Sequence, residues 1–119
     1  MKSFKKAATK LGKEHFVRYA SVVGDFNPIH YDLDYAKKLN MPTVVAQGPL
    51  VVLLALDAIA AEGGLSNVKG VVARMTGPVF PDADLIVEAR EDGSIQISDK
   101  GRIVLTGTVE TKGRIGESI

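Results

Sequence analysis

The sequence contains no cysteine and no tryptophan. Without cysteine the chain can form neither a disulfide framework nor a Cys-ligated metal site, and it offers no thiol nucleophile. It also lacks an excess of either charge, because 15 basic and 14 acidic residues leave a formal net charge of +1. A chain so close to neutral has no general electrostatic attraction to nucleic acid or to a membrane surface.

Long apolar runs are absent as well. The longest, residues 49–61, is interrupted by Asp57 and is shorter than the ~20 residues that a membrane-spanning helix needs. The basic start of the chain is not followed by the ~7–15 apolar residues of a secretory signal, so we expect a soluble cytoplasmic protein. The 119 residues are 45% hydrophobic and 24% charged, which is typical of one globular domain covering residues 1–119.

The first half of the chain has the periodicity of helices. Apolar residues from Phe16 to Val23 recur at helical spacing and predict a helix over residues 13–23 that Gly24 ends. A second short helix should begin after Asp32, which is suited to cap it. Residues 48–62 are apolar on nearly every side, which is typical of a buried helix.

The second half has the pattern of β-strands. Segments rich in β-branched residues predict strands over 68–75, 85–90, 94–98 and 103–111. Asp-Gly and Lys-Gly pairs lie between the later segments, as in hairpin turns. In the last strand we expect Ile103, Leu105 and Val109 to share one face with Gly107.

Together these elements predict an α+β protein with the hot-dog fold, in which a curved antiparallel sheet wraps round a buried central helix. Such a sheet leaves edges that proteins normally pair or protect. A homodimer that joins two sheets is the simplest solution for so small a chain.

The loop between the first two helices carries the clearest chemical signal, because it contains one of only two histidines. Pro28 fixes its own φ angle and favours an extended Asn27, which makes the loop bent and stiff. Asp25 and His30 can therefore converge on one point, where a carboxylate and an imidazole could hold a water molecule and move protons. Asn27 could orient either of them.

A second signal lies at the start of the apolar helix, which reads Gln47-Gly48-Pro49. Proline is favoured at the first helical position, and glycine lets a ligand approach the backbone. Free N–H groups at such a helix start could stabilise the negative charge that develops on a carbonyl oxygen. We predict that Asn27 and Gly48 contribute to substrate binding.

These stretches resemble the MaoC-like dehydratases, the family of R-specific enoyl-CoA hydratases. The resemblance is carried by Tyr19-x4-Gly24-Asp25-x-Asn27-Pro28-x-His30-x-Asp32-x3-Ala36 and continues through Val45-Ala46-Gln47-Gly48-Pro49-Leu50. It is weaker around Arg74 and Pro78-Val79-Phe80-Pro81. The family often has His at the position of Gln47, and many members read Pro-Gly-Asp where this chain reads Pro81-Asp82-Ala83.

The resemblance implies a hot-dog fold with a brief first strand, a dimer, and the addition of water to trans-2-enoyl thioesters or the reverse dehydration. It implies that Asp25 and His30 are the catalytic pair and that the N–H of Gly48 serves an oxyanion hole. The substrate would be a thioester of CoA or of an acyl carrier protein, and no cofactor would be needed.

Other interpretations of the same residues remain open. Hot-dog thioesterases also use a carboxylate and a helix start, and a non-catalytic acyl-binding or partner subunit of a heteromeric dehydratase could share this fold. A metal site at His30 is only a weak alternative, because the neighbouring aspartates are suited to cap helices rather than to bind a metal. Five lysines could face CoA phosphates or an acidic carrier protein: Lys2, Lys5, Lys6, Lys10 and Lys13.

Overall fold

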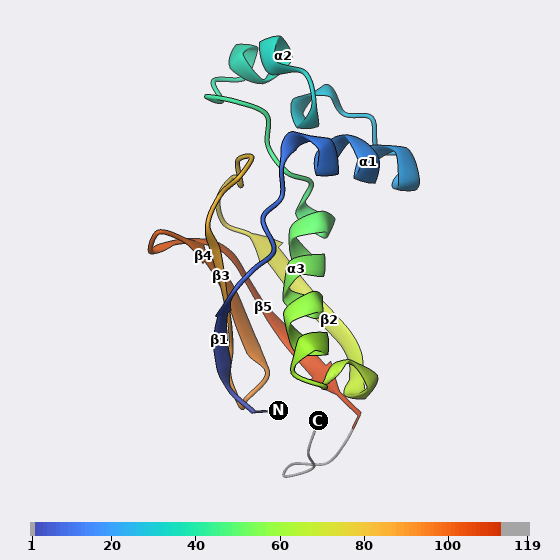
Figure 1. Cartoon of the computed structure of the whole chain (residues 1–119), viewed down its shortest axis with the longest axis vertical. Coiled ribbons are helices and arrows are strands. Elements are labelled where there is room, and N and C mark those ends of the chain that lie inside the picture. The colour runs from blue at the N-terminus through green and yellow to red at the C-terminus, as the bar shows by residue number, and fades with distance from the viewer. Residues whose placement is uncertain (1, 113–119) are drawn as a thin grey trace.

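Figure 1 shows the computed structural model of the chain, which describes residues 2–112. The α-helices are α1 (Lys13–Val23), α2 (Leu33–Lys38) and α3 (Gly48–Ala61), and two 3-10 helices are η1 (Pro28–His30) and η2 (Leu65–Asn67). The strands are β1 (Phe4–Ala7), β2 (Val68–Met75), β3 (Leu85–Ala89), β4 (Ser94–Asp99) and β5 (Arg102–Thr111). All elements expected from the sequence are present, including the brief first strand.

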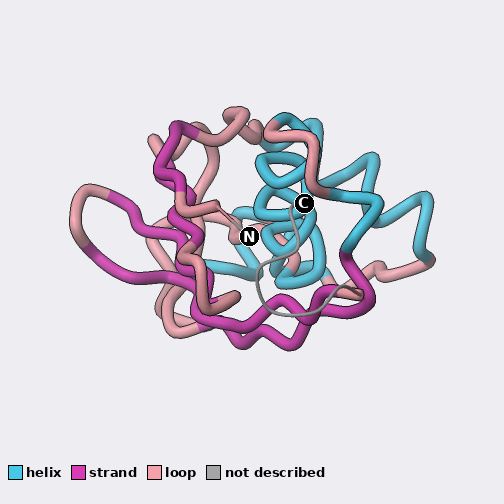
Figure 2. Tube along the Cα trace, turned by 90° about the horizontal axis from the view of Figure 1, so that it is seen from below, coloured by secondary structure: helices cyan, strands magenta, loops and turns pink. Residues whose placement is uncertain are grey.

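The strands form one antiparallel sheet in the order β1-β3-β4-β5-β2. Seen from below, the sheet curves around α3 (Figure 2). The alternating burial along β3 shows which face of the sheet packs against the helix. Leu85, Val87 and Ala89 are buried on that face, while the residues between them are more exposed. This is the hot-dog fold that the sequence predicts.

Helix α3 is buried on one side rather than on every side. Its buried residues recur every three or four positions and face the sheet: Val51, Leu54, Ala55, Ala58 and Ile59. Leu53 and Asp57 lie on the opposite side and are exposed. The expectation that α3 is buried on nearly every side is therefore wrong for the side that carries Leu53, and the exposed Asp57 needs no buried partner.

The ends of the two preceding helices follow their capping signals. Gly24 adopts a left-handed conformation with φ 73°, and its N–H donates to the carbonyl of Ala20 at 2.9 Å. Asp32 caps α2 by accepting the N–H of Tyr35 at 3.1 Å. At the start of α1, Nδ1 of His15 accepts the N–H of Gly12 at 2.9 Å, so the second histidine of the chain has a structural role.

Strand β5 departs from the predicted alternation. Ile103 is 44% exposed, whereas the adjacent Val104 and Leu105 are both fully buried. The register explains the difference, because Ser98 pairs with Ile103 while Ile97 pairs with Leu105. Val104 is thus the extra residue of a bulge, which turns Ile103 to the outer face. The prediction that Ile103 shares the inner face is wrong.

Gly107 of β5 allows β2 to approach closely. A Cβ atom at Gly107 would lie 2.5 Å from the carbonyl oxygen of Val72 and 2.9 Å from the Cα of Ala73, which are backbone atoms that cannot move aside alone. Gly70 on β2 has open space around it, with nothing within 4 Å of the same position. The two glycines therefore differ in packing although both lie in strands.

We predict that Gly107→Ala lowers the free energy of unfolding by about 1–3 kcal/mol, since overpacking forces the strands apart. Gly70→Ala is the matched control and should be neutral or slightly stabilising. Urea unfolding followed by circular dichroism measures both. Equal effects of the two substitutions would contradict the close approach at Gly107.

Candidate active site

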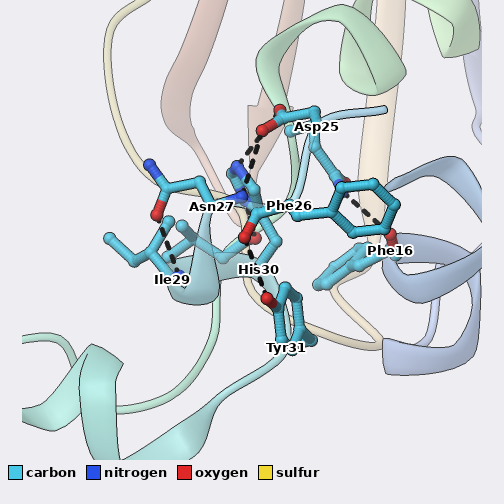
Figure 3. Close-up of polar contacts among 9 residues, drawn as sticks. Phe16, Asp25, Phe26, Asn27, Ile29, His30 and Tyr31 are labelled. Carbon is cyan, nitrogen blue, oxygen red and sulfur yellow. Dashed lines mark hydrogen bonds and ion pairs between the residues drawn. The ribbon is translucent and has the colours of Figure 1, made fainter. Parts of the chain in front are cut away.

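The loop between α1 and α2 is held in shape by its own short-range hydrogen bonds. The side-chain oxygen of Asn27 accepts the N–H of Ile29 at 3.1 Å and so caps η1, which starts at Pro28. The hydroxyl of Tyr31 donates to the carbonyl of Phe26 at 2.8 Å and closes the loop from the other end. Figure 3 shows these contacts around His30, the last residue of η1.

His30 is fixed by a hydrogen bond to a buried segment. Its Nδ1 lies 2.8 Å from the carbonyl oxygen of Val45, and a carbonyl can only accept, so this nitrogen carries a proton. The N–H of Val45 in turn donates to the carbonyl of Ile29 at 3.1 Å. Because two bonds join the loop to Val45, which is itself buried, the imidazole has a defined position and orientation.

Asp25 lies beside the other nitrogen of this ring. Its Oδ2 is 3.7 Å from Nε2 of His30, while its Oδ1 accepts the N–H of Asn27 at 3.3 Å. The Asp25 side chain is 43% exposed and that of His30 is 12% exposed, so the pair is reachable from solvent. The structure thus brings together the two residues that the sequence predicts to converge (Figure 3).

The position of the proton on Nδ1 determines what this pair can do. In a neutral imidazole the other nitrogen, Nε2, is an acceptor. Asp25 Oδ2 is also an acceptor when ionised, and the 3.7 Å gap exceeds a direct hydrogen bond. Two acceptors at this spacing suit a small molecule with two O–H donors between them, and water is such a molecule.

Asn27 helps to hold Asp25 and His30 in place through two hydrogen bonds. Its N–H orients the Asp25 carboxylate, and its side-chain oxygen is used to cap the short helix that carries His30. These contacts fit the expectation that Asn27 orients the pair. A contact between Asn27 and a substrate stays a prediction.

Gly48 lies at the start of α3, close to the segment that holds His30. It lies three positions after Val45 in the chain, so their Cα atoms are within about 11 Å of each other. Gly48 is the first residue of a 14-residue helix whose first turn contains Pro49 and has no side-chain cap. Its N–H therefore has no helical partner and lies at the positive end of the helix dipole.

Gln47, which directly precedes α3, makes a buried contact that the sequence did not predict. It is 1% exposed, and its Nε2 donates to the carbonyl of Phe16 in α1 at 2.8 Å. It therefore joins the helix that precedes Asp25 to the start of α3. Its Oε1 is buried without a hydrogen-bond partner among the described residues. The sequence contained one sign of this contact, because Gln47 is the single polar residue in the apolar stretch before Pro49.

The other candidate groups lie in ordinary structural contacts. Lys6 pairs with Glu62 at 3.6 Å and Lys10 with Asp84 at 3.2 Å, so two of the five N-terminal lysines face carboxylates of this chain.

Across residues 2–112, no group of three or more His, Asp or Glu side chains is arranged to hold a metal ion. The same part of the chain contains no helix long and apolar enough to cross a membrane.

The pKa of Asp92 is lowered, chiefly because the Ser94 hydroxyl and then the Ser94 N–H donate hydrogen bonds to its carboxylate. Asp92 lies in the turn between β3 and β4. The effect therefore belongs to a hairpin and not to the loop that carries Asp25.

Two characterised proteins are similar to this chain in sequence. The chain is 30% identical over 98 residues to peroxisomal enoyl-CoA hydratase 2 of Arabidopsis thaliana, a match that covers 76% of this chain and 32% of the plant protein. The chain thus spans about a third of that relative, and 8% of a peroxisomal hydratase-dehydrogenase-epimerase of Saccharomyces cerevisiae, to which it is 34% identical over 74 residues.

Solved structures show the same fold. The unliganded R-hydratase PhaJ1 from Pseudomonas aeruginosa superimposes with a TM-score of 0.73 at 25% identity, covering 92% of this chain and 78% of that one. The (R)-hydratase of A. caviae involved in PHA biosynthesis gives 0.78 at 20% identity, with 95% of both chains covered. The family described as "MaoC like domain" matches residues 2–113. Because this match spans almost the whole sequence, the chain belongs to the MaoC-like dehydratase family.

Proposed function

We propose that the protein hydrates trans-2-enoyl thioesters to R-3-hydroxyacyl thioesters, or catalyses the reverse dehydration. The observation that carries the proposal is the convergence of Asp25 Oδ2 and His30 Nε2 at 3.7 Å on a solvent-reachable loop. The plant relative is named an enoyl-CoA hydratase and the bacterial structures are named R-hydratases, which supports the same reaction here.

In the proposed step, a water molecule donates one O–H to each of the two acceptors. Its oxygen then bonds to C3 of the enoyl chain, and one member of the pair takes the proton released from the water. The C2–C3 double bond becomes a single bond, and the group that took the proton from the water then gives it to the α-carbon on the same face. Every atom of the water is thereby added to the substrate with no net transfer of electrons, so the proposed reaction needs no redox cofactor.

The thioester carbonyl is proposed to lie at the start of α3. As C3 is attacked, negative charge moves onto the carbonyl oxygen, and the free N–H of Gly48 at the positive end of the helix can stabilise it. Gly48 is suited to this role because it has no side chain between its N–H and a ligand. The carrier, CoA or an acyl carrier protein, and a cytoplasmic location stay predictions.

We predict that Asp25→Asn and His30→Ala each lower kcat/KM for crotonyl-CoA by about 10²–10⁴-fold, the usual contribution of a positioned acid or base. The loss of enoyl absorbance measures the rate directly. Release of free CoA, measured with a thiol reagent, reports the alternative reaction of a thioesterase in the same samples.

Asp57→Asn is the matched control, because it makes the same chemical change at an exposed position of α3 and should leave the rate unchanged. Full hydratase activity of a folded Asp25→Asn variant would contradict the assignment. Activity of the wild-type chain only after addition of a second protein would instead support a subunit of a heteromeric dehydratase.

We further propose that the protein is a homodimer joined along β2. The two edges of the sheet differ in length, because β1 has four residues whereas β2 has eight. Very short edge strands resist pairing, and long ones favour it. Val72 on β2 is 71% exposed, and a second copy would cover it.

We predict that sedimentation gives twice the mass of one chain and that Val72→Lys raises the dimer dissociation constant by about tenfold or more. Complete burial of a valine contributes about 1.5–3 kcal/mol, and the substitution also brings two like charges together. Thr108→Lys is the control, since Thr108 pairs with Val72 from the neighbouring β5 but does not lie on an edge. A monomeric wild type would contradict the proposal.

A further inference from the structure

The side chain of Gln47 joins the two helices on which the candidate site depends. Gln47 directly precedes α3, and its Nε2 donates to the carbonyl of Phe16 in α1 at 2.8 Å. Figure 1 shows α1 lying across the end at which α3 begins. Gly24 ends α1 and Asp25 follows it, while α3 starts at Gly48. One hydrogen bond therefore ties the helix that leads to the carboxylate to the helix that carries the free N–H.

Gln47 occupies the N-cap position of α3 without acting as a cap. An N-cap side chain normally accepts an N–H of the first helical turn, but that of Gln47 makes no such hydrogen bond to the described residues of α3. Its amide is directed to α1 instead. The side chain therefore leaves the N–H of Gly48 open for a ligand.

The contribution of Gln47 to stability is small at best. The net gain from one hydrogen bond is modest, and a buried polar atom without a partner costs at least as much. Gln47 has both, because its Oε1 is buried without a partner among the described residues. The carbonyl of Phe16 lies inside α1, where a helical N–H already bonds to it. A buried glutamine that gains so little for the fold indicates a role in the site.

We propose that Gln47 is a positioning residue, which fixes the start of α3 against α1 and so sets where the Gly48 N–H lies relative to Asp25. The inference rests on the proposed function, since it takes Gly48 as the donor to the thioester carbonyl. In a conjugated enoyl thioester the carbonyl oxygen and C3 have a fixed separation. The donor for the oxygen and the water that attacks C3 must therefore be held at matching positions.

Gln47 acts in this way without touching the substrate, because it is only 1% exposed. If its hydrogen bond is lost, the Gly48 N–H moves relative to the reacting atoms and stabilises the charge on the carbonyl oxygen less well. A displacement of about 1 Å can lower a rate about 100-fold. The remaining contacts of the substrate are kept, so kcat should change more than KM. A residue that serves only the fold would show the opposite pattern, a loss of stability at normal kcat.

The first experiment compares Gln47→Met with the wild type on crotonyl-CoA. Methionine keeps the length of the side chain and removes both the donor and the unpartnered acceptor. We expect kcat to fall by about 10–100-fold while KM stays within about threefold, and the midpoint of urea unfolding to stay the same or rise. Gln96→Met is the matched control, because it removes an amide that donates to Glu88 at 3.4 Å within the sheet. It should leave kcat unchanged.

A second measurement reports on the Gly48 N–H without turnover. Crotonyl-CoA with an isotope-labelled carbonyl is bound to the Asp25→Asn variant, which is expected to hold it without reaction, and its carbonyl stretch is recorded by infrared spectroscopy. A hydrogen bond to Gly48 should lower the stretching frequency, and adding Gln47→Met should reduce this shift. Adding Gln96→Met should not. An unchanged shift after Gln47→Met would overturn the inference.

The inference and the proposed function can fail separately. If the wild type hydrates crotonyl-CoA and Gln47→Met keeps its kcat, Gln47 does not position the site and the inference alone is wrong. Gln47→Leu replaces Gln47→Met if the latter prevents folding, and failure of both variants to fold would assign Gln47 to stability and also overturn the inference. If the wild type does not hydrate crotonyl-CoA, the proposed function fails and the inference fails with it.

Discussion

The candidate site depends on the buried segment that leads into α3. Residues 44–47 are at most 9% exposed, so their backbone groups need partners within the protein. The carbonyl of Val45 accepts from His30, its N–H donates to Ile29, and the N–H of Ala46 donates to Val79 at 2.8 Å. The bonds that satisfy this segment are therefore the bonds that fix the imidazole, so the stability of the core and the geometry of the site have the same origin.

Local signals in the sequence predicted the elements well. Gly24, Asp32 and Pro49 mark helix boundaries through their own backbone preferences, which act over a few residues. The bulge at Val104 was not predictable in this way, since it depends on how β4 and β5 pair. The Gln47–Phe16 hydrogen bond joins residues 31 positions apart, and only the folded chain shows it. Convergence of Asp25 and His30 was predictable because Pro28 limits the loop between them.

Two departures from the family pattern have different physical consequences. Asp82 stands where many members have glycine, and it adopts φ 62°, a left-handed conformation that glycine enters freely. Its N–H donates to the carbonyl of Leu11 at 2.8 Å, so the turn is tied to the segment that precedes α1. Gln47 stands where the family often has histidine. Its amide keeps a donor for Phe16 but leaves a buried acceptor, Oε1, without a partner among the described residues.

Two different kinds of contact shape the region around Gly48. Asp25 and His30 lie on a loop that is held by hydrogen bonds, whereas a groove of about 350 Å³ between α3 and the edge strand β2 is lined mainly by apolar residues. Hydrogen bonds restrict direction and distance, which proton transfer requires. Apolar contacts depend mainly on buried area and tolerate changes in side-chain size. Side chains along β2 can therefore change in size without moving Asp25 or His30, and Gly48, which lines the groove, follows the segment that holds His30.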